Sequence, residues 1–165
     1  MLETEIVILG GGIAGNYLAY LLSKNHIPCI VVEKHSSFAT RPLQCAGILS
    51  QKILKLAPFS KKLILNRVSK VKLTTPSNHS LILTGHEKPV IIDRIGFDAY
   101  FGNQAQKQGA HYLFNTKYKF HKKITPYKVL VVTSQENIKC NMVVGADGPG
   151  STVAKNFGIK NIENY

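Results

Sequence analysis

Apolar positions in the first part of the chain form two short unbroken runs, separated by a stretch with helical periodicity. The runs are IVIL at 6–9, which leads into glycines, and CIVV at 29–32, which is followed by an acidic residue. Unbroken aliphatic runs of this length are typical of parallel strands that are buried on both faces. In the stretch between them, Leu18, Leu21 and Leu22 fall on one helical stripe. The pattern predicts a βαβ unit.

The pattern further along the chain mixes strands with one clear helix. Runs rich in β-branched residues predict short strands between 67 and 93, separated by turns. Phe97, Phe101 and Ala105 share one face of a predicted helix that starts near residue 97 and ends at Gly109. Strand-like runs follow at 110–115, 128–134 and 139–148. This order predicts an α/β sheet of the nucleotide-binding kind that carries an antiparallel β excursion.

Composition supports a folded domain and excludes several classes of protein. The 165 residues are 44% apolar and 18% charged, which excludes a disordered chain. The aliphatic runs are too short to cross a bilayer, and the acidic N-terminus argues against a signal peptide, so we expect a cytoplasmic protein. Cys29, Cys45 and Cys140 form no CxxC pair and the six histidines show no ligand spacing, so we expect neither disulfides nor a metal site.

The charge is strongly basic, with 21 Lys and Arg against nine Asp and Glu, a formal net charge of +12. Three explanations stay open: a solvated basic surface, attraction to anionic lipid head groups, and nucleic-acid binding. The only candidate for nucleic acid is KYKFHKK at 117–123, whose alternation is rather that of a solvent-facing strand with Tyr118 and Phe120 on one side. We therefore expect peripheral contact with an anionic membrane rather than with nucleic acid.

Gly10, Gly12 and Gly15 form a GxGxxG motif between the first predicted strand and the helix, which opens with Ile13 and Ala14. The three glycines allow a tight turn, close approach of the backbone to a pyrophosphate, and close packing of helix on strand. The helix N-terminus adds unpaired N–H groups and a partial positive charge. The motif predicts a site for an adenine dinucleotide.

Glu33 stands at the end of the second predicted strand, 18 residues after Gly15, and is followed by Lys34. A carboxylate at this place accepts hydrogen bonds from ribose hydroxyls and disfavours a 2′-phosphate. The motif alone does not separate FAD from NAD. A nicotinamide-binding oxidoreductase module therefore stays open, although no catalytic pair supports it.

Four stretches together carry a resemblance to a known family: GGGIAGNYLAYLLSK at 10–24, QCAGILS at 44–50, IDRIGFDAYFGNQAQKQGA at 92–110 and VVGADGPGSTVAK at 143–155. They resemble the glutathione-reductase-type flavoproteins of the p-hydroxybenzoate hydroxylase group. Within that group they are most similar to the geranylgeranyl reductases, which saturate isoprenoid double bonds of archaeal membrane lipids and chlorophyll-type precursors. The resemblance implies a Rossmann-like FAD-binding domain over residues 1–165.

The resemblance also implies roles for individual residues. The arginine of the RxxFD stretch, Arg94, would lie near the phosphates or adenosine of FAD, where a guanidinium offers fixed donors. The alternative for Arg94 is a surface ion pair with Asp93 or Asp98, and Asp98 is also a candidate helix cap. In CAGILS, Cys45 would face the flavin ring and the reacting bond of the substrate and donate a hydrogen bond, tune the flavin or deliver a proton.

Ala46 and Gly47 belong to the same loop and would lie beside the flavin. Arg41, just upstream, would reach the flavin or an anionic lipid head group. The alternative for the loop cysteine is a buried structural thiol.

The GADG stretch, with Gly145, Asp147 and Gly148, resembles the family's second cofactor turn. The family has a third, a later GDA-type motif, and a substrate-covering sheet before it; the 165 residues contain neither. The resemblance therefore implies the N-terminal part of a longer flavoprotein, with a complementary C-terminal piece as a partner. The implied activity is FAD-dependent reduction of isoprenoid C=C bonds in a prenyl lipid. The alternatives are a flavin-dependent monooxygenase and a non-catalytic dinucleotide-binding module.

Overall fold

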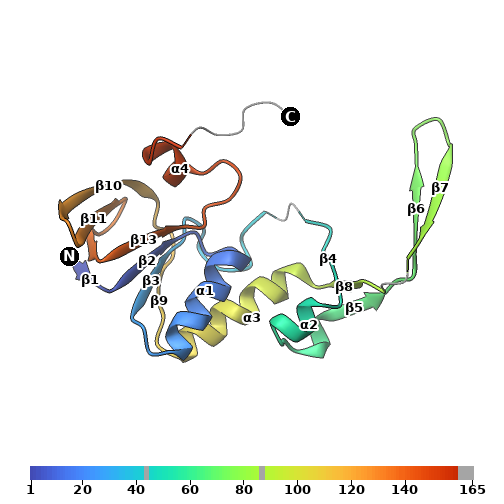
Figure 1. Cartoon of the computed structure of the whole chain (residues 1–165), viewed down its shortest axis with the longest axis horizontal. Helices are drawn as coiled ribbons and strands as arrows, with labels where there is room; N and C mark the ends of the chain where they lie inside the picture. Colours follow the sequence, from blue (N-terminus) through green and yellow to red (C-terminus); the bar gives the residue numbers. More distant parts are fainter. Residues whose placement is uncertain (43–44, 86–87, 160–165) are drawn as a thin grey trace. The chain divides into compact units, whose positions relative to one another are not determined.

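The computed structural model describes residues 1–42, 45–85 and 88–159 (Figure 1). The chain divides into two compact units. Met1–Arg41 together with Asp98–Tyr165 forms one, here called the sheet unit, and Pro42–Phe97 forms the other, here called the inserted unit.

A four-stranded parallel sheet forms the centre of the sheet unit, with the strand order β13-β2-β3-β9. Its strands are β2 (Ile6–Leu9), β3 (Cys29–Val32), β9 (His111–Leu113) and β13 (Met142–Gly145). All four residues of β3 are buried, as its unbroken aliphatic run predicted. The predicted fold class, an α/β domain with a parallel central sheet and antiparallel additions, is confirmed.

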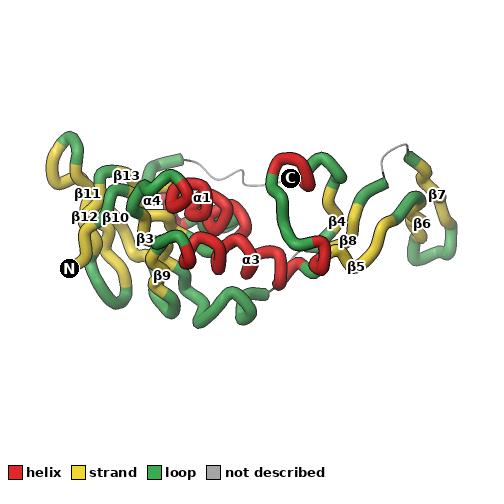
Figure 2. Tube along the Cα trace, turned by 90° about the horizontal axis from the view of Figure 1, so that it is seen from below, coloured by secondary structure: helices red, strands yellow, loops and turns green. Residues whose placement is uncertain are grey.

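Helices α1 (Ile13–Lys24) and α3 (Arg94–Lys107) lie side by side next to the parallel sheet, as Figure 2 shows. In α1 the buried residues are small or polar, Gly15, Asn16, Ala19 and Ser23. The predicted leucine stripe is wrong at Leu21, which is 38% exposed. Small residues on the inner face let the helix approach the sheet closely, and Leu21 lies on the exposed side of the helix.

Helix α3 confirms the predicted helix and its inner face, because Phe97, Phe101 and Ala105 are all buried. Its start differs from the expectation. The helix begins at Arg94, and Asp93 is its cap, because the Asp93 Oδ1 atom accepts a hydrogen bond from the Gly96 N–H at 3.0 Å. Asp98 lies inside the helix and has no capping role.

A second sheet of the sheet unit has the order β1-β12-β11-β10. Its strands are β1 (Leu2–Glu3), β12 (Ile138–Cys140), β11 (Lys128–Thr133) and β10 (Tyr118–Thr125). A register shift between Tyr118 and Phe120 interrupts the alternation in β10. Tyr118 therefore lies with His121, at 2.6 Å between the hydroxyl and Nδ1, and the predicted pairing of Tyr118 with Phe120 on one side is wrong.

The inserted unit contains a small antiparallel sheet of order β4-β8-β5 and a separate hairpin of β6 and β7. Its elements are β4 (Ile48–Leu49), α2 (Ile53–Leu56), the 3₁₀ helix η1 (Lys61–Leu63), β5 (Ile64–Arg67), β6 (Lys70–Thr74), β7 (Ser80–Thr84) and β8 (Val90–Ile92). Strands β6, β7 and β8 are the short strands predicted between 67 and 93, and β4 and β5 precede them.

Candidate functional site

The carboxyl ends of three parallel strands meet at one edge of the central sheet. Leu9 is in register with Val32 on one side and with Gly145 on the other. The backbone continues this pairing one step beyond the strands: the Gly10 N–H donates to the Val32 carbonyl at 2.9 Å, and the Ala146 N–H donates to the Leu9 carbonyl at 2.8 Å. Segments more than 100 residues apart in sequence are thereby held together where ligands bind in such sheets.

Two glycines of the GxGxxG turn are required by close contacts. Gly10 has a φ of +112°, and a Cβ atom there would overlap the carbonyl oxygen of Ala146. A Cβ atom on Gly15 would overlap the carbonyl oxygen of Gly10. The first glycine thus allows the two turns to touch, and the last brings α1 against the turn.

The N-terminus of α1 follows directly. Gly12 is the N-cap, and within the described part of the chain no side chain caps this end and no acidic residue stands in the first turn. Ala14 in this first turn is exposed, and Ile13 is half-buried. The free N–H groups and the helix dipole make this end suited to an anion.

Glu33 is only 4% exposed and is held in a fixed orientation. Its Oε2 atom accepts the Gly11 N–H at 2.7 Å, and its Oε1 atom accepts the His35 N–H at 2.9 Å and lies 2.6 Å from His35 Nδ1. The carboxylate therefore links the glycine turn to the end of β3. Sequence reasoning missed Gly11 and His35, because neither a third adjacent glycine nor a histidine two residues after an acid is a recognised signal.

Arg41 extends over the same turn. Its Nη1 atom lies 3.0 Å from Asp98 Oδ2 and 3.3 Å from the Gly11 carbonyl oxygen. A Cβ atom on Gly12 would lie 3.0 Å from Arg41 Nη2. A cation therefore stands beside the uncapped helix end, whereas Lys34, predicted at the same site, is exposed at the surface.

The residues of this edge suit the adenosine diphosphate part of a dinucleotide. A backbone turn without side chains, a helix N-terminus and a guanidinium suit a pyrophosphate. Glu33 retains acceptor capacity on both carboxylate oxygens and suits ribose hydroxyls. The structure brings together Gly10, Gly12, Gly15 and Glu33 at this edge, and it adds Arg41, which was expected to reach the flavin or a lipid head group.

The GADG turn contacts this edge through its backbone rather than through its acid. Asp147 accepts the Ser151 hydroxyl at 2.6 Å and the Val153 N–H at 3.1 Å, so its carboxylate is bonded to the start of α4 (Thr152–Asn156). Gly148 has a φ of +86°, and Gly145 ends β13. The GADG turn contacts the edge through the carbonyl group of Ala146, which lies against Gly10.

The remaining predicted residues belong to the inserted unit. Cys45 and Ala46 are exposed, and the Gly47 N–H donates to Cys45 Sγ at 3.4 Å. Gly47 has a φ of +68°, and its carbonyl accepts the Ile92 N–H at 2.9 Å, which fixes the loop on β8. The Arg94 guanidinium lies 6.0 Å from the centre of the Phe97 ring.

The loop cysteine differs from the other two thiols. Cys29 and Cys140 are buried, and burial raises the pKa of both thiols. The expectation of a buried loop cysteine as the alternative for Cys45 is wrong, because Cys45 is exposed. In residues 1–42, 45–85 and 88–159 no group of three His, Cys, Asp or Glu side chains is placed to hold a metal ion.

Comparison with known proteins identifies relatives of the whole chain. The family model described as "FAD binding domain" matches residues 3–164. Digeranylgeranylglycerophospholipid reductase 1 of Methanosphaera stadtmanae is 29% identical over 168 residues, which cover 96% of this chain and 41% of that protein. A protein of Methanosarcina barkeri encoded in the nifH2 5′ region is 28% identical over 169 residues, which cover 94% of this chain and 88% of that protein.

A solved structure extends the comparison to three dimensions. The crystal structure of a geranylgeranyl bacteriochlorophyll reductase-like protein from Thermoplasma acidophilum matches with a TM-score of 0.82 at 25% identity, covering all of this chain and 44% of that one. The chain thus spans less than half the length of the reductases that it matches. The resemblance to geranylgeranyl reductases inferred from the four motifs is confirmed.

Proposed function

Because this chain belongs to the FAD binding domain family, we propose that the edge formed by Gly10, Glu33 and Ala146 binds the adenosine diphosphate part of FAD. The observation that carries the proposal is the joint position of an uncapped helix N-terminus, the Arg41 guanidinium and a buried, doubly anchored Glu33. Gly12, Ile13, Ala14 and Gly15 would present N–H groups to the pyrophosphate. Gly145, Asp147 and Gly148 would support this edge through the backbone contact at Ala146.

We further propose that the chain is the N-terminal part of an FAD-dependent oxidoreductase that reduces isoprenoid C=C bonds of a prenyl lipid. Relatives named as digeranylgeranylglycerophospholipid reductases support this substrate class. A reduced flavin supplies a hydride for such a bond, with a proton added at the neighbouring carbon. The share of those relatives that the chain covers supports a complementary C-terminal piece as its partner.

The chain's own contribution is binding and positioning. Glu33 would accept the ribose hydroxyls, Arg41 and Arg94 would bind phosphate oxygens, and Lys34 would add positive charge nearby. Cys45, exposed on a loop that Gly47 fixes to β8, would hold its thiol towards the flavin ring or the reacting bond, with Ala46 beside it. A thiol there would donate a hydrogen bond or a proton. Contact with an anionic membrane would bring the chain to its lipid substrate.

Calorimetric titration with FAD and with FMN tests the cofactor site, because FMN lacks the adenosine part. We expect FAD to bind and FMN not to bind. In Glu33→Gln the amide cannot accept both the Gly11 and the His35 N–H groups, so FAD affinity should fall by about 1–3 kcal/mol. Glu136→Gln, on a half-exposed side chain near the N-terminus, is the matched control and should leave affinity unchanged. Equal affinity for FMN and FAD would contradict the proposed site.

The reaction is tested separately, with dithionite as reductant and a digeranylgeranyl phospholipid as substrate, followed by mass spectrometry. Reduction adds one H₂ per double bond, whereas a monooxygenase would add an oxygen atom. Binding of FAD without any change in lipid mass, both alone and with the C-terminal part of a reductase relative added, would support a non-catalytic module instead.

A further inference from the structure

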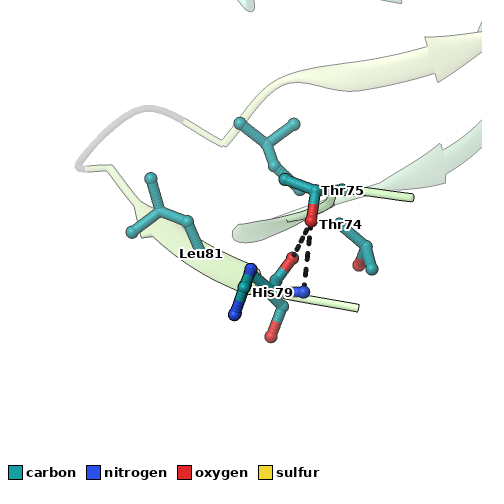
Figure 3. Close-up of a pocket in the computed structure, with 6 residues that line it drawn as sticks. Thr74, Thr75, His79 and Leu81 are labelled. Carbon is teal, nitrogen blue, oxygen red and sulfur yellow. Dashed lines mark hydrogen bonds between the residues drawn. The ribbon is translucent and has the colours of Figure 1, made fainter. Parts of the chain in front are cut away.

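The hairpin of β6 and β7 in the inserted unit is fully formed and fully exposed. All ten residues of its two strands are exposed. Its base is held by the Val68 N–H, which donates to the Pro89 carbonyl at 3.1 Å. In its turn the Thr75 N–H donates to the His79 carbonyl at 2.9 Å. The Thr75 hydroxyl bonds to the His79 carbonyl and N–H, as Figure 3 shows. The ribbon extends away from β5 and β8 (Figure 1) as a preformed structure.

The register of the hairpin separates it into an apolar and a polar face. Val71 lies opposite Leu83, and Leu73 lies opposite Leu81, so these four side chains share one face. They are 39–57% exposed. The other face carries Lys70, Lys72, Thr74, Ser80 and Thr84, with Ile82 as its one large apolar residue. The hairpin is therefore amphipathic.

We expect the exposed apolar face of the hairpin to bind a partner. An isolated two-stranded ribbon is marginally stable in water, and four exposed aliphatic side chains on one face add an unfavourable contact with water. A hollow of about 370 Å³ lies at the tip of the hairpin, and its lining includes Leu73 and Leu81 of this face together with Thr74 and Ser80 of the other and Thr75 and His79 of the turn. Contiguous exposed apolar surface of this kind marks an interaction site.

The positive charge of the inserted unit indicates the chemical nature of the partner. Residues 42–97 contain nine Lys and Arg against two Asp and Glu, so they carry +7 of the formal net charge of +12. A second copy of the same unit would bring two surfaces of like charge together, which is unfavourable. An anionic lipid surface is complementary to this charge and offers an apolar phase for the aliphatic side chains.

We propose that the apolar face of the β6–β7 hairpin inserts into the interface of an anionic lipid bilayer. Val71, Leu73, Leu81 and Leu83 enter the boundary between head groups and acyl chains. Lys70 and Lys72 on the opposite face extend their long side chains to the lipid phosphates. No helix within the described residues is long and apolar enough to span a membrane, and insertion of a hairpin face needs none. The apolar face of the hairpin would thus be the membrane contact of the proposed function, and its insertion does not require bound FAD.

Co-sedimentation of the purified chain with vesicles tests the proposal. The probes are vesicles of phosphatidylcholine alone and vesicles in which part of it is replaced by phosphatidylglycerol. We expect binding that requires phosphatidylglycerol and weakens as salt rises. Leu73→Ser with Leu81→Ser should lower the partition coefficient about tenfold or more. Lys70→Gln with Lys72→Gln should lower it by about fivefold for each lysine and reduce its salt dependence.

Matched controls lie on the same hairpin and in the sheet unit. Ile82→Ser removes an equally exposed aliphatic side chain from the opposite face, and Lys24→Gln with Lys107→Gln removes two charges elsewhere; both should leave partitioning within about twofold of the wild type. Circular dichroism of each variant reports whether it is folded.

Three outcomes would overturn the proposal. The first is the absence of binding to vesicles with phosphatidylglycerol. The second is an equal loss of binding in Ile82→Ser and in the Leu73/Leu81 variant. The third is a dimer in solution that the Leu73/Leu81 variant abolishes, since the face would then serve a second copy. Failure to bind FAD with intact vesicle binding would contradict the proposed function and not this inference.

Discussion

Strand β3 and the hairpin β6–β7 both contain several aliphatic residues and have opposite environments. Val31 in β3 is completely buried and is paired on both sides by parallel neighbours, Ile8 in β2 and Tyr112 in β9. Val71 in β6 has a single neighbouring strand and is 39% exposed. The comparison shows that aliphatic content predicts a strand, whereas burial depends on what packs against it. The buried sheet supplies the stability of the fold, and the hairpin keeps apolar surface for binding.

The largest expected effect comes from placing the same charge in both regions. Val31→Asp buries a carboxylate without a partner and should cost more than about 5 kcal/mol, enough to unfold a typical domain. Val71→Asp stays in contact with water and should change the free energy of unfolding by less than about 1 kcal/mol. Urea denaturation followed by circular dichroism measures both. A similar loss in the two variants would mean that the hairpin is packed in solution, and the comparison would fail.

A smaller effect is expected where the sheet edge meets the glycine turn. Gly10→Ala introduces a side chain at positive φ that overlaps the Ala146 carbonyl, so it should cost about 2–4 kcal/mol of stability and weaken FAD binding. Gly150→Ala meets no atom within 4 Å and is the control, expected to be nearly neutral in both measurements. Urea denaturation and calorimetric FAD titration of the two variants decide whether the contact between the turns is needed for stability and for FAD binding. An unaffected Gly10→Ala variant would argue against it.

The smallest effect is expected from removing the buried hydroxyl of Tyr112 in β9. Tyr112 donates to Asn16 Oδ1 at 3.0 Å, so Tyr112→Phe leaves a buried acceptor unpaired and should cost about 1–2 kcal/mol at pH 7. Burial, with a smaller contribution from Cys29, raises the pKa of the Tyr112 phenol above its ordinary value. The neutral phenol therefore stabilises the folded state below about pH 10, and this contribution is lost as pH rises further.

Urea denaturation at several alkaline pH values checks the predicted fall in stability above pH 10. The loss of stability above pH 10 should be shallower in Tyr112→Phe than in the wild type. Tyr127, which is 82% exposed at the β10–β11 turn, gives the control, since Tyr127→Phe should leave the free energy of unfolding at pH 7 unchanged. An identical alkaline loss in Tyr112→Phe and wild type would show that another group causes it.

Patterns in the sequence predicted the elements that are stabilised locally or buried on both faces. The aliphatic runs of β2 and β3, the glycine turn and the inner face of α3 were all predicted, because each has a distinct periodicity or motif. Because consecutive parallel strands end at the same edge of a sheet, the sequence also predicts that Gly10 and Glu33 lie at one edge.

Features that depend on a distant contact or on a single hydrogen bond were not predictable in this way. The Asp93 cap moved the start of α3, a register shift separated Tyr118 from Phe120, and close packing of α1 left Leu21 exposed. The contact of His35 with Glu33 arises from the turn after β3 rather than from a motif. Exposure of the hairpin could not be predicted, because its pattern is that of an ordinary half-buried sheet.

The Arg41–Asp98 ion pair stands where the chain leaves the sheet unit and where it returns. With 3.0 Å between the two charged groups, the ends of the 56-residue excursion are held together by the sheet unit's own residues. The entropy of closing that loop grows only slowly with its length, so the length of the segment between the two residues can change at a small cost in stability. Evolution could lengthen or shorten the segment while the glycine turn, Glu33 and Arg41 kept their positions, which would let one cofactor platform acquire different docking surfaces.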